Sequence, residues 1–216
     1  MLSQISGTIF LFFMYSLQHS FFASIRIKKL FRKYLPKFFT LYRLIYTIMQ
    51  AFLFILLWII VPKPADIIWN LSGIWYWLFR IIQGLAFIGL LLAFSDFSLK
   101  EFTGMAGLDR FLSNQSPVYD DEIYQLNRSG MYAISRHPIY FFTLLIFLFR
   151  PYMTLFDLLV FIWLVVYFHI GSIWEERRME TVFPKEYAEY KRQVSRIIPL
   201  LYLQRRLGAV MRAIID

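Results

Sequence analysis

Five apolar segments, separated by polar stretches, set the pattern of this chain. A helix that crosses a membrane needs about 20 predominantly apolar residues, and four of the five segments approach that length. The pattern therefore predicts an all-α integral membrane bundle of about five transmembrane helices. The segments are Ile5–Phe22, Tyr42–Val61, Ile74–Phe94, Pro138–Phe149 and Tyr152–Trp174.

The fourth segment is too short to span. From Ile139 to Phe149 it would cross about half of a 30 Å hydrocarbon core at about 1.5 Å per residue. Either its helix begins near Met131 and carries Arg136 and His137 inside it, or it begins at Pro138, a residue favoured in a first turn. Both alternatives place His137 near or within membrane depth.

Basic residues predict the orientation of the bundle. They gather after the first segment, between the third and fourth segments and after Trp174, whereas the opposite side carries Lys63, Arg80 and Arg150. By the positive-inside rule, the basic loops and the C-terminal tail are cytoplasmic. The formal charge of +9 thus reflects membrane topology rather than nucleic-acid binding.

Composition supports a single membrane domain over residues 1–216. The 59% hydrophobic content exceeds the roughly 45–50% of soluble proteins. We expect a three-helix part over 1–95, a cytoplasmic loop or surface helix over 96–130, and a helical hairpin with an amphipathic tail over 131–216. The N-terminus lacks a basic region and a cleavage site, which indicates a retained first helix. The absence of cysteine excludes zinc-thiolate sites and a cysteine nucleophile.

Ionisable residues near helix ends are the first candidates for chemistry, because they are costly to place in so apolar a chain. Arg136 and His137 precede the fourth segment and Glu175 and Glu176 follow the fifth. A helix N-terminus with an arginine favours an anionic ligand, although an Arg-His pair also suits lipid headgroups. Adjacent helical residues point about 100° apart, so one glutamate can enter the bundle while the other meets solvent.

The histidines give weaker signals. His169 lies two turns before Glu176 on the same helical face, where a core histidine is more typical than a catalyst. His19 lies at the cytoplasmic end of the first helix and either reaches the same pocket or forms a polar helix end. Three histidines without cysteine give slight support for a metal, and we predict none.

These residues together resemble the isoprenylcysteine carboxyl methyltransferase superfamily, small membrane enzymes that use S-adenosylmethionine. The N-terminal half is similar to the methanethiol S-methyltransferase and nurim-like branch, through Gln18-His19-Ser20 and Pro151–Thr154. The matching motifs are Gly130-Met131-Tyr132, Arg136-His137-Pro138-Ile139-Tyr140, Glu175-Glu176-Arg177, Phe183, Tyr187, Tyr190 and Ile198-Pro199.

The resemblance implies a methyltransferase whose cofactor, S-adenosylmethionine, lies on the cytoplasmic side in the hairpin and tail. It implies that Tyr187 and Tyr190 line the adenine, and that His19, His169 or Glu176 acts in catalysis, the histidines as bases. The cofactor-binding residues it implies are Tyr132, Arg136, His137, Tyr140, Glu175, Glu176, Tyr187 and Tyr190.

The acceptor stays open. A small thiol such as methanethiol, a prenylated cysteine carboxylate and a phospholipid amine all fit the resemblance. The chain has Gly104-Met105-Ala106-Gly107 where the branch is expected to carry a Gly-Leu-Arg-Gln-like stretch. A non-enzymatic nurim-like membrane protein and a nicotinamide-dependent reductase, whose sterol-reducing members share the C-terminal pattern, are the alternatives.

Overall fold

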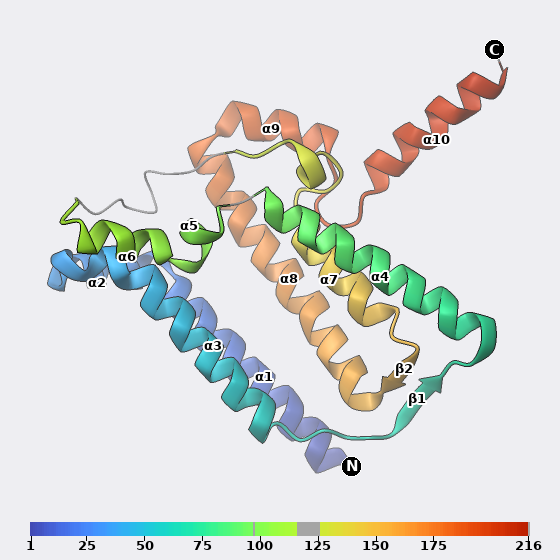
Figure 1. Cartoon of the computed structure of the whole chain (residues 1–216), viewed down its shortest axis with the longest axis horizontal. Helices are drawn as coiled ribbons and strands as arrows, with labels where there is room; N and C mark the ends of the chain where they lie inside the picture. The colour runs from blue at the N-terminus through green and yellow to red at the C-terminus, as the bar shows by residue number, and fades with distance from the viewer. Residues whose placement is uncertain (97, 116–125, 216) are drawn as a thin grey trace. The chain divides into compact units, whose positions relative to one another are not determined.

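The computed structural model describes residues 1–96, 98–115 and 126–215, with side chains up to residue 208 (Figure 1). The described residues form two compact units, each assembled from segments that are distant in sequence. The first unit takes its residues from Met1–Ile68, Phe97–Ile123 and Thr154–Trp163, and the second from Trp69–Asp96, Tyr124–Met153 and Leu164–Asp216. Organisation as one domain remains a prediction.

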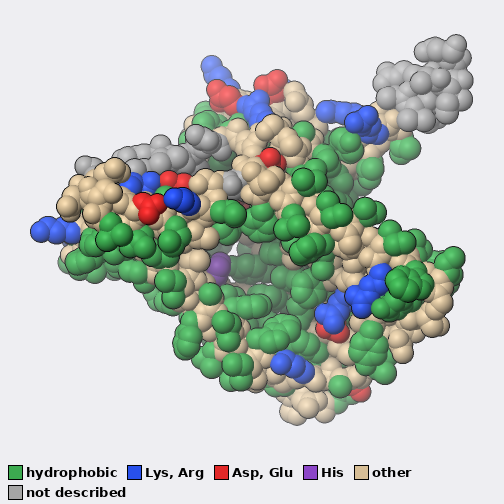
Figure 2. All heavy atoms as spheres, viewed as in Figure 1, with side chains coloured by type: hydrophobic (Ala, Val, Ile, Leu, Met, Phe, Trp, Pro, Cys, Tyr) green, Lys and Arg blue, Asp and Glu red, His purple; other side chains and the backbone are tan. Residues whose placement is uncertain are grey.

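The protein is a helical membrane protein, as the hydropathy pattern predicted. Within the described ranges, three helical stretches are long and apolar enough to cross a membrane: Pro36–Ile60, Gly73–Ser95 and Leu155–Val182. A fourth span arises if Leu2–Ala23 and Ile25–Tyr34, which meet at a 51° bend, are taken together. Exposed hydrophobic side chains cover much of these helices, as a lipid-facing surface requires (Figure 2).

The first unit is built on α1 (Leu2–Ala23), which packs against α3 (Tyr42–Ile60). Its core is aromatic, with the Phe12 ring stacked on Trp163 at 4.6 Å between centroids, and the Trp163 indole N–H donates to Ser16 Oγ at 2.8 Å. The end of α3 nearer its N-terminus is covered by four short helices. These are α2 (Ile25–Tyr34), η1 (Pro36–Leu41), α5 (Leu99–Thr103) and α6 (Met105–Leu112).

The second unit is built on α4 (Gly73–Ser95) and the short α7 (Pro138–Leu148), which pack closely together. At Gly89 the Phe142 ring occupies the space where a Cβ would lie, so glycine allows the two helices to approach. This unit also contains η2 (Gly130–Ala133), the part of α8 (Leu155–Val182) that follows Trp163, α9 (Pro184–Gln193) and α10 (Leu200–Ile215).

The short helix α7 begins at Pro138, which confirms the second of the two starts considered from the sequence. Residues 130–133 form the separate η2 turn, so Arg136 and His137 lie outside the helix, with His137 at its N-cap position. Strand β2 (Tyr152–Thr154) follows α7 and pairs with β1 (Ile67–Asn70).

Two predicted boundaries in the C-terminal part are wrong. Helix α8 runs from Leu155 to Val182, past the predicted end near Trp174, so Glu175 and Glu176 lie inside the helix rather than at its end. The expected amphipathic tail is not one continuous helix, because α9 ends at Gln193 and extended backbone begins at Val194. The stretch 96–130, expected as a loop or a surface helix, contains the short helices α5 and α6, while its residues 116–125 lie outside the described residues.

Candidate active site

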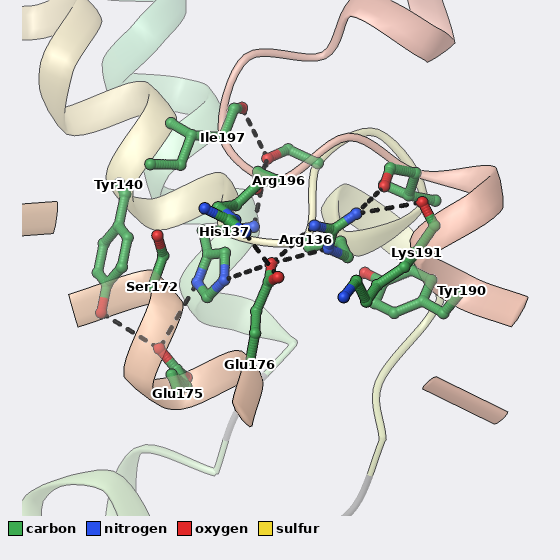
Figure 3. Close-up of polar contacts among 12 residues, drawn as sticks. Arg136, His137, Tyr140, Ser172, Glu175, Glu176, Tyr190, Lys191, Arg196 and Ile197 are labelled. Atoms are coloured by element: carbon green, nitrogen blue, oxygen red, sulfur yellow. Dashed lines mark hydrogen bonds and ion pairs between the residues drawn. The ribbon is translucent and has the colours of Figure 1, made fainter. Parts of the chain in front are cut away.

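The buried centre of the second unit is an ion pair between Arg136, before α7, and Glu176 on α8 (Figure 3). Arg136 Nε and Nη2 lie 2.9 and 2.8 Å from Glu176 Oε1, and the two side chains are 7% and 3% exposed. Removing such charges from water is costly, so each needs its partner. Of the two glutamates, Glu176 points inward and Glu175 is 56% exposed, as the helical geometry predicted.

Arg136 also contacts the end of α9. Its Nη1 donates to the carbonyl oxygen of Lys191 at 3.3 Å and to that of Val194. The guanidinium therefore joins α8, the end of α9 and the segment before α7 into one polar centre (Figure 3).

His137 contacts both glutamates. Its Nδ1 lies 3.5 Å from Glu175 Oε2 and its Nε2 lies 3.4 Å from Glu176 Oε1. The imidazole stacks on the Tyr140 ring, which in turn stacks on Phe168 with centroids 4.3 Å apart. Because Tyr140 Oη donates to Glu175 Oε2 at 3.3 Å, these rings and carboxylates fix one another's orientation.

Backbone hydrogen bonds attach the segment 195–197 to the residues before α7. Arg136 N donates to Ser195 O at 3.0 Å, and His137 N donates to Arg196 O at 2.9 Å. Ser135 Oγ donates to the carbonyl oxygens of Arg196 and Ile197. This pairing brings a second guanidinium to the site, with Arg196 Nε 3.3 Å from Glu176 Oε2.

Arg196 is a site residue that sequence reasoning missed. Arg196 lies between two helices, in a segment without a periodic hydropathy pattern. The only signal in the sequence was its position two residues before the Ile198-Pro199 motif. Asp96 was also missed: its Oδ2 accepts the Met131 N–H at 3.3 Å and so anchors η2 beside Tyr132. Gly130 adopts a positive φ of 57° there, and Asp96 fills the space a Cβ would need.

Three buried polar atoms of the site make no hydrogen bond within the described parts of the chain: His137 Nε2, Glu176 Oε2 and Arg196 Nε. The last two face each other at ion-pair distance without hydrogen-bond alignment. Buried polar groups are normally paired, so unsatisfied ones in a native structure call for a functional explanation. These three atoms are therefore the candidates for contact with a bound ligand.

The predicted tyrosines lie in the core of the second unit. Tyr187 and Tyr190 are each 3% exposed and cluster with Val194, and Tyr190 Oη donates to the Tyr132 carbonyl oxygen at 2.6 Å. Burial raises the pKa of Tyr132, Tyr187 and Tyr190 well above its usual value, so all three stay protonated at neutral pH. Contact with an adenine ring stays a prediction for Tyr187 and Tyr190.

The two other predicted histidines lie outside this cluster. His169 is exposed on α8, although it shares a helical face with the buried Glu176. His19 belongs to the first unit, where the Tyr46 hydroxyl lies 3.0 Å from its Nε2. A catalytic role for either histidine stays a prediction.

Comparison with known proteins adds independent information. The family described as phospholipid methyltransferase matches residues 73–186, slightly more than half of the chain. The chain is similar to methanethiol S-methyltransferase 2 of Bradyrhizobium diazoefficiens, with 28% identity over 89% of this chain and 72% of the relative. Methanethiol S-methyltransferase 1 of the same organism is 27% identical over 86% of this chain and 64% of the relative.

No solved structure matches the chain. The matched region contains α4, α7, α8 and the start of α9, and with them Arg136, His137 and Glu176. The same residues carry the motif resemblance to membrane methyltransferases, so the family match and the motifs agree. The chain belongs to the phospholipid methyltransferase family.

Proposed function

We propose that this protein is an S-adenosylmethionine-dependent membrane methyltransferase whose cofactor site is the cluster around Arg136, His137 and Glu176. The observation that carries the proposal is the set of buried polar atoms without hydrogen bonds at His137, Glu176 and Arg196. Family membership supports the reaction class. The distribution of basic residues supports a cytoplasmic position for the site.

The residues present fit the cofactor. S-adenosylmethionine carries a carboxylate, an ammonium group and a sulfonium, and the cluster offers guanidinium groups and carboxylates within one small region. Arg196, partly exposed at the edge, suits the carboxylate, whereas Glu175 and Glu176 suit the ammonium group.

When bound, S-adenosylmethionine supplies an electrophilic methyl group on a sulfonium. The chain's contribution is to position and to exclude water, because methyl transfer needs little covalent help from a protein. Arg136 and Glu176 are held from several elements, so they keep the site in one arrangement before a ligand binds. Glu176, already paired with Arg136, serves as a fixed anion rather than as a general base.

We propose a small thiol as the acceptor, because both similar proteins are named methanethiol S-methyltransferases. A phospholipid amine is the second candidate, supported by the description of the family. A thiol with a pKa near about 8.5 benefits from a base. Of the two histidines predicted as bases, His169 belongs to the same unit as the cluster, and we propose it for this role.

Calorimetry with S-adenosylhomocysteine on the purified full-length protein tests the cofactor site. We expect binding by the parent and at least tenfold weaker binding by Glu176→Gln. A matched control is Tyr76→Phe on α4, away from the cluster, which keeps the parental affinity. Absence of binding by a folded parent protein refutes the proposal.

The acceptor is tested by supplying cells with labelled methionine. Label in volatile dimethyl sulfide after addition of methanethiol supports the thiol acceptor, and label in lipid extracts supports the phospholipid amine. Cells that carry Glu176→Gln provide the background for both measurements. Label in neither fraction, with cofactor binding intact, refutes both acceptors.

A further inference from the structure

A small polar cavity lies in the first unit, at the N-terminal end of α3, and none of its residues belongs to the candidate active site. Thr40 and Arg43 line it from η1 and α3, and α5 and α6 close it with Glu101, Gly104 and Arg110. Gly107 also lines it, and the Thr40 carbonyl oxygen occupies the place a Cβ there would take. The glycine thus lets α6 approach η1 and form the wall.

The Thr40 hydroxyl points to a ligand in this cavity. The residue is 8% exposed, and its Oγ1 is buried without a hydrogen-bond partner among the residues that the structure describes. An unpaired buried hydroxyl is costly, because it has lost its contacts with water. A threonine here is favourable when an external group supplies the missing hydrogen bond.

The charges around the hydroxyl favour an anion. Arg43 and Arg110 both line the cavity, while Glu101 opposes them and pairs with Arg110 through two contacts of 2.8 and 3.1 Å. Arg43 Nε donates to the Phe102 carbonyl oxygen at 3.2 Å, which fixes the guanidinium at the wall.

The position of the cavity relative to the membrane indicates a lipid ligand. Pro36–Ile60 has 25 residues and is about 37 Å long at about 1.5 Å per residue, longer than a hydrocarbon core of about 30 Å. Its first turns therefore reach the headgroup region. The segment 25–43 that leads into it carries seven basic and no acidic residues, and such segments attract anionic lipids.

The cavity is small, about 20 Å³, which is room for about one water-sized group. It therefore admits one oxygen of a phosphate and leaves the rest of the headgroup at its mouth. We propose that the cavity lined by Thr40, Arg43 and Arg110 holds a phosphate oxygen of an anionic phospholipid, which stays bound and is not methylated. This site is independent of the proposed function.

The test uses the full-length protein in detergent, titrated with phosphatidic acid and followed by native mass spectrometry. Thr40→Val keeps the shape and removes the hydroxyl, so we expect about tenfold weaker lipid binding and an unchanged or slightly raised melting temperature without lipid. Thr40→Ser restores the hydroxyl and the affinity. Arg26→Gln, on α2 outside the cavity, is the charge control and changes affinity less than twofold.

Diacylglycerol, which lacks the phosphate, and inorganic phosphate, which lacks the lipid, are expected to bind far more weakly than phosphatidic acid. Parental affinity in Thr40→Val, an equal loss in Arg26→Gln, or equal binding of inorganic phosphate overturns the proposal. Methylation of the retained lipid also overturns it. Binding of S-adenosylhomocysteine is measured on the same samples, so failure of the cofactor site is seen separately.

Discussion

Glu176→Gln tests whether the buried ion pair organises the second unit. The substitution keeps the size of the side chain but leaves Arg136, 7% exposed, without a counter-charge. Breaking a buried pair from one side costs about 3–5 kcal/mol. We expect the lower end, because the carbonyl oxygens of Lys191 and Val194 still accept hydrogen bonds from the guanidinium.

A loss of about 3 kcal/mol corresponds to a melting temperature about 6–12 °C lower for a chain of this size. The assay is thermal unfolding of the full-length protein in detergent, followed by tryptophan fluorescence. Glu175→Gln is the matched control, because its side chain is 56% exposed and a surface pair contributes about 1 kcal/mol or less. Equal shifts for the two variants would refute the structural reasoning.

The double variant Arg136→Met with Glu176→Leu separates stability from binding. Apolar side chains of similar size often replace a buried pair without loss of stability. We expect the double variant to melt closer to the parent than Glu176→Gln does, and to have lost binding of S-adenosylhomocysteine. Recovery of binding along with stability would show that the charges serve packing alone.

Three further predictions concern the surroundings of the site. Gly89→Ala places a methyl group against the Phe142 ring and lowers the melting temperature by several degrees, whereas Gly84→Ala, with open space around it, changes it little. A greater effect at Gly84 would contradict the packing of α4 on α7. Tyr190→Phe removes the 2.6 Å hydrogen bond to the Tyr132 carbonyl oxygen and lowers the free energy of unfolding by about 1 kcal/mol, measured by denaturant titration. An unchanged midpoint of the titration would contradict this prediction. Because burial raises the pKa of Tyr132 and Tyr190, their contribution to stability is fully present below the usual pKa of about 10 and falls as the pH rises above it. The loss of stability at alkaline pH should therefore be smaller in Tyr190→Phe than in the parent. A stability-versus-pH profile identical to the parent's would contradict this.

Local chemistry made part of the fold predictable from sequence. The start of α7 at Pro138 follows from the fixed φ of proline and its missing N–H, both harmless in a first turn. The end of α8 was predicted too early, because hydropathy indicates whether the side chains of a segment suit lipid or water and not whether its backbone is helical. Charged residues after Trp174 still form helical hydrogen bonds, and α8 continues until the residues just before Pro184.

The candidate site was predictable where residues share one helix or one motif, and less so where folding joins distant segments. Helical geometry predicted that one of the two adjacent glutamates turns inward, but not that this one is Glu176. The burial of Tyr187 and Tyr190 did not, because tyrosine at helical spacing is equally typical of a membrane surface. Arg196 joins the cluster through backbone pairing with Arg136 and His137, a contact that no local pattern encodes.

The pairing of Arg136 with the segment that follows α9 means that the site can assemble only late in the synthesis of the chain. Arg136 and Val194 are 58 residues apart, so at about 5–20 residues per second a ribosome needs about 3–12 s between them. The α8 partner Glu176 follows 40 residues after the arginine, and the carbonyl oxygens of Lys191 and Val194 follow later still. A nascent chain stopped before Ser195 would therefore lack the backbone pairing that brings Arg196 to the site.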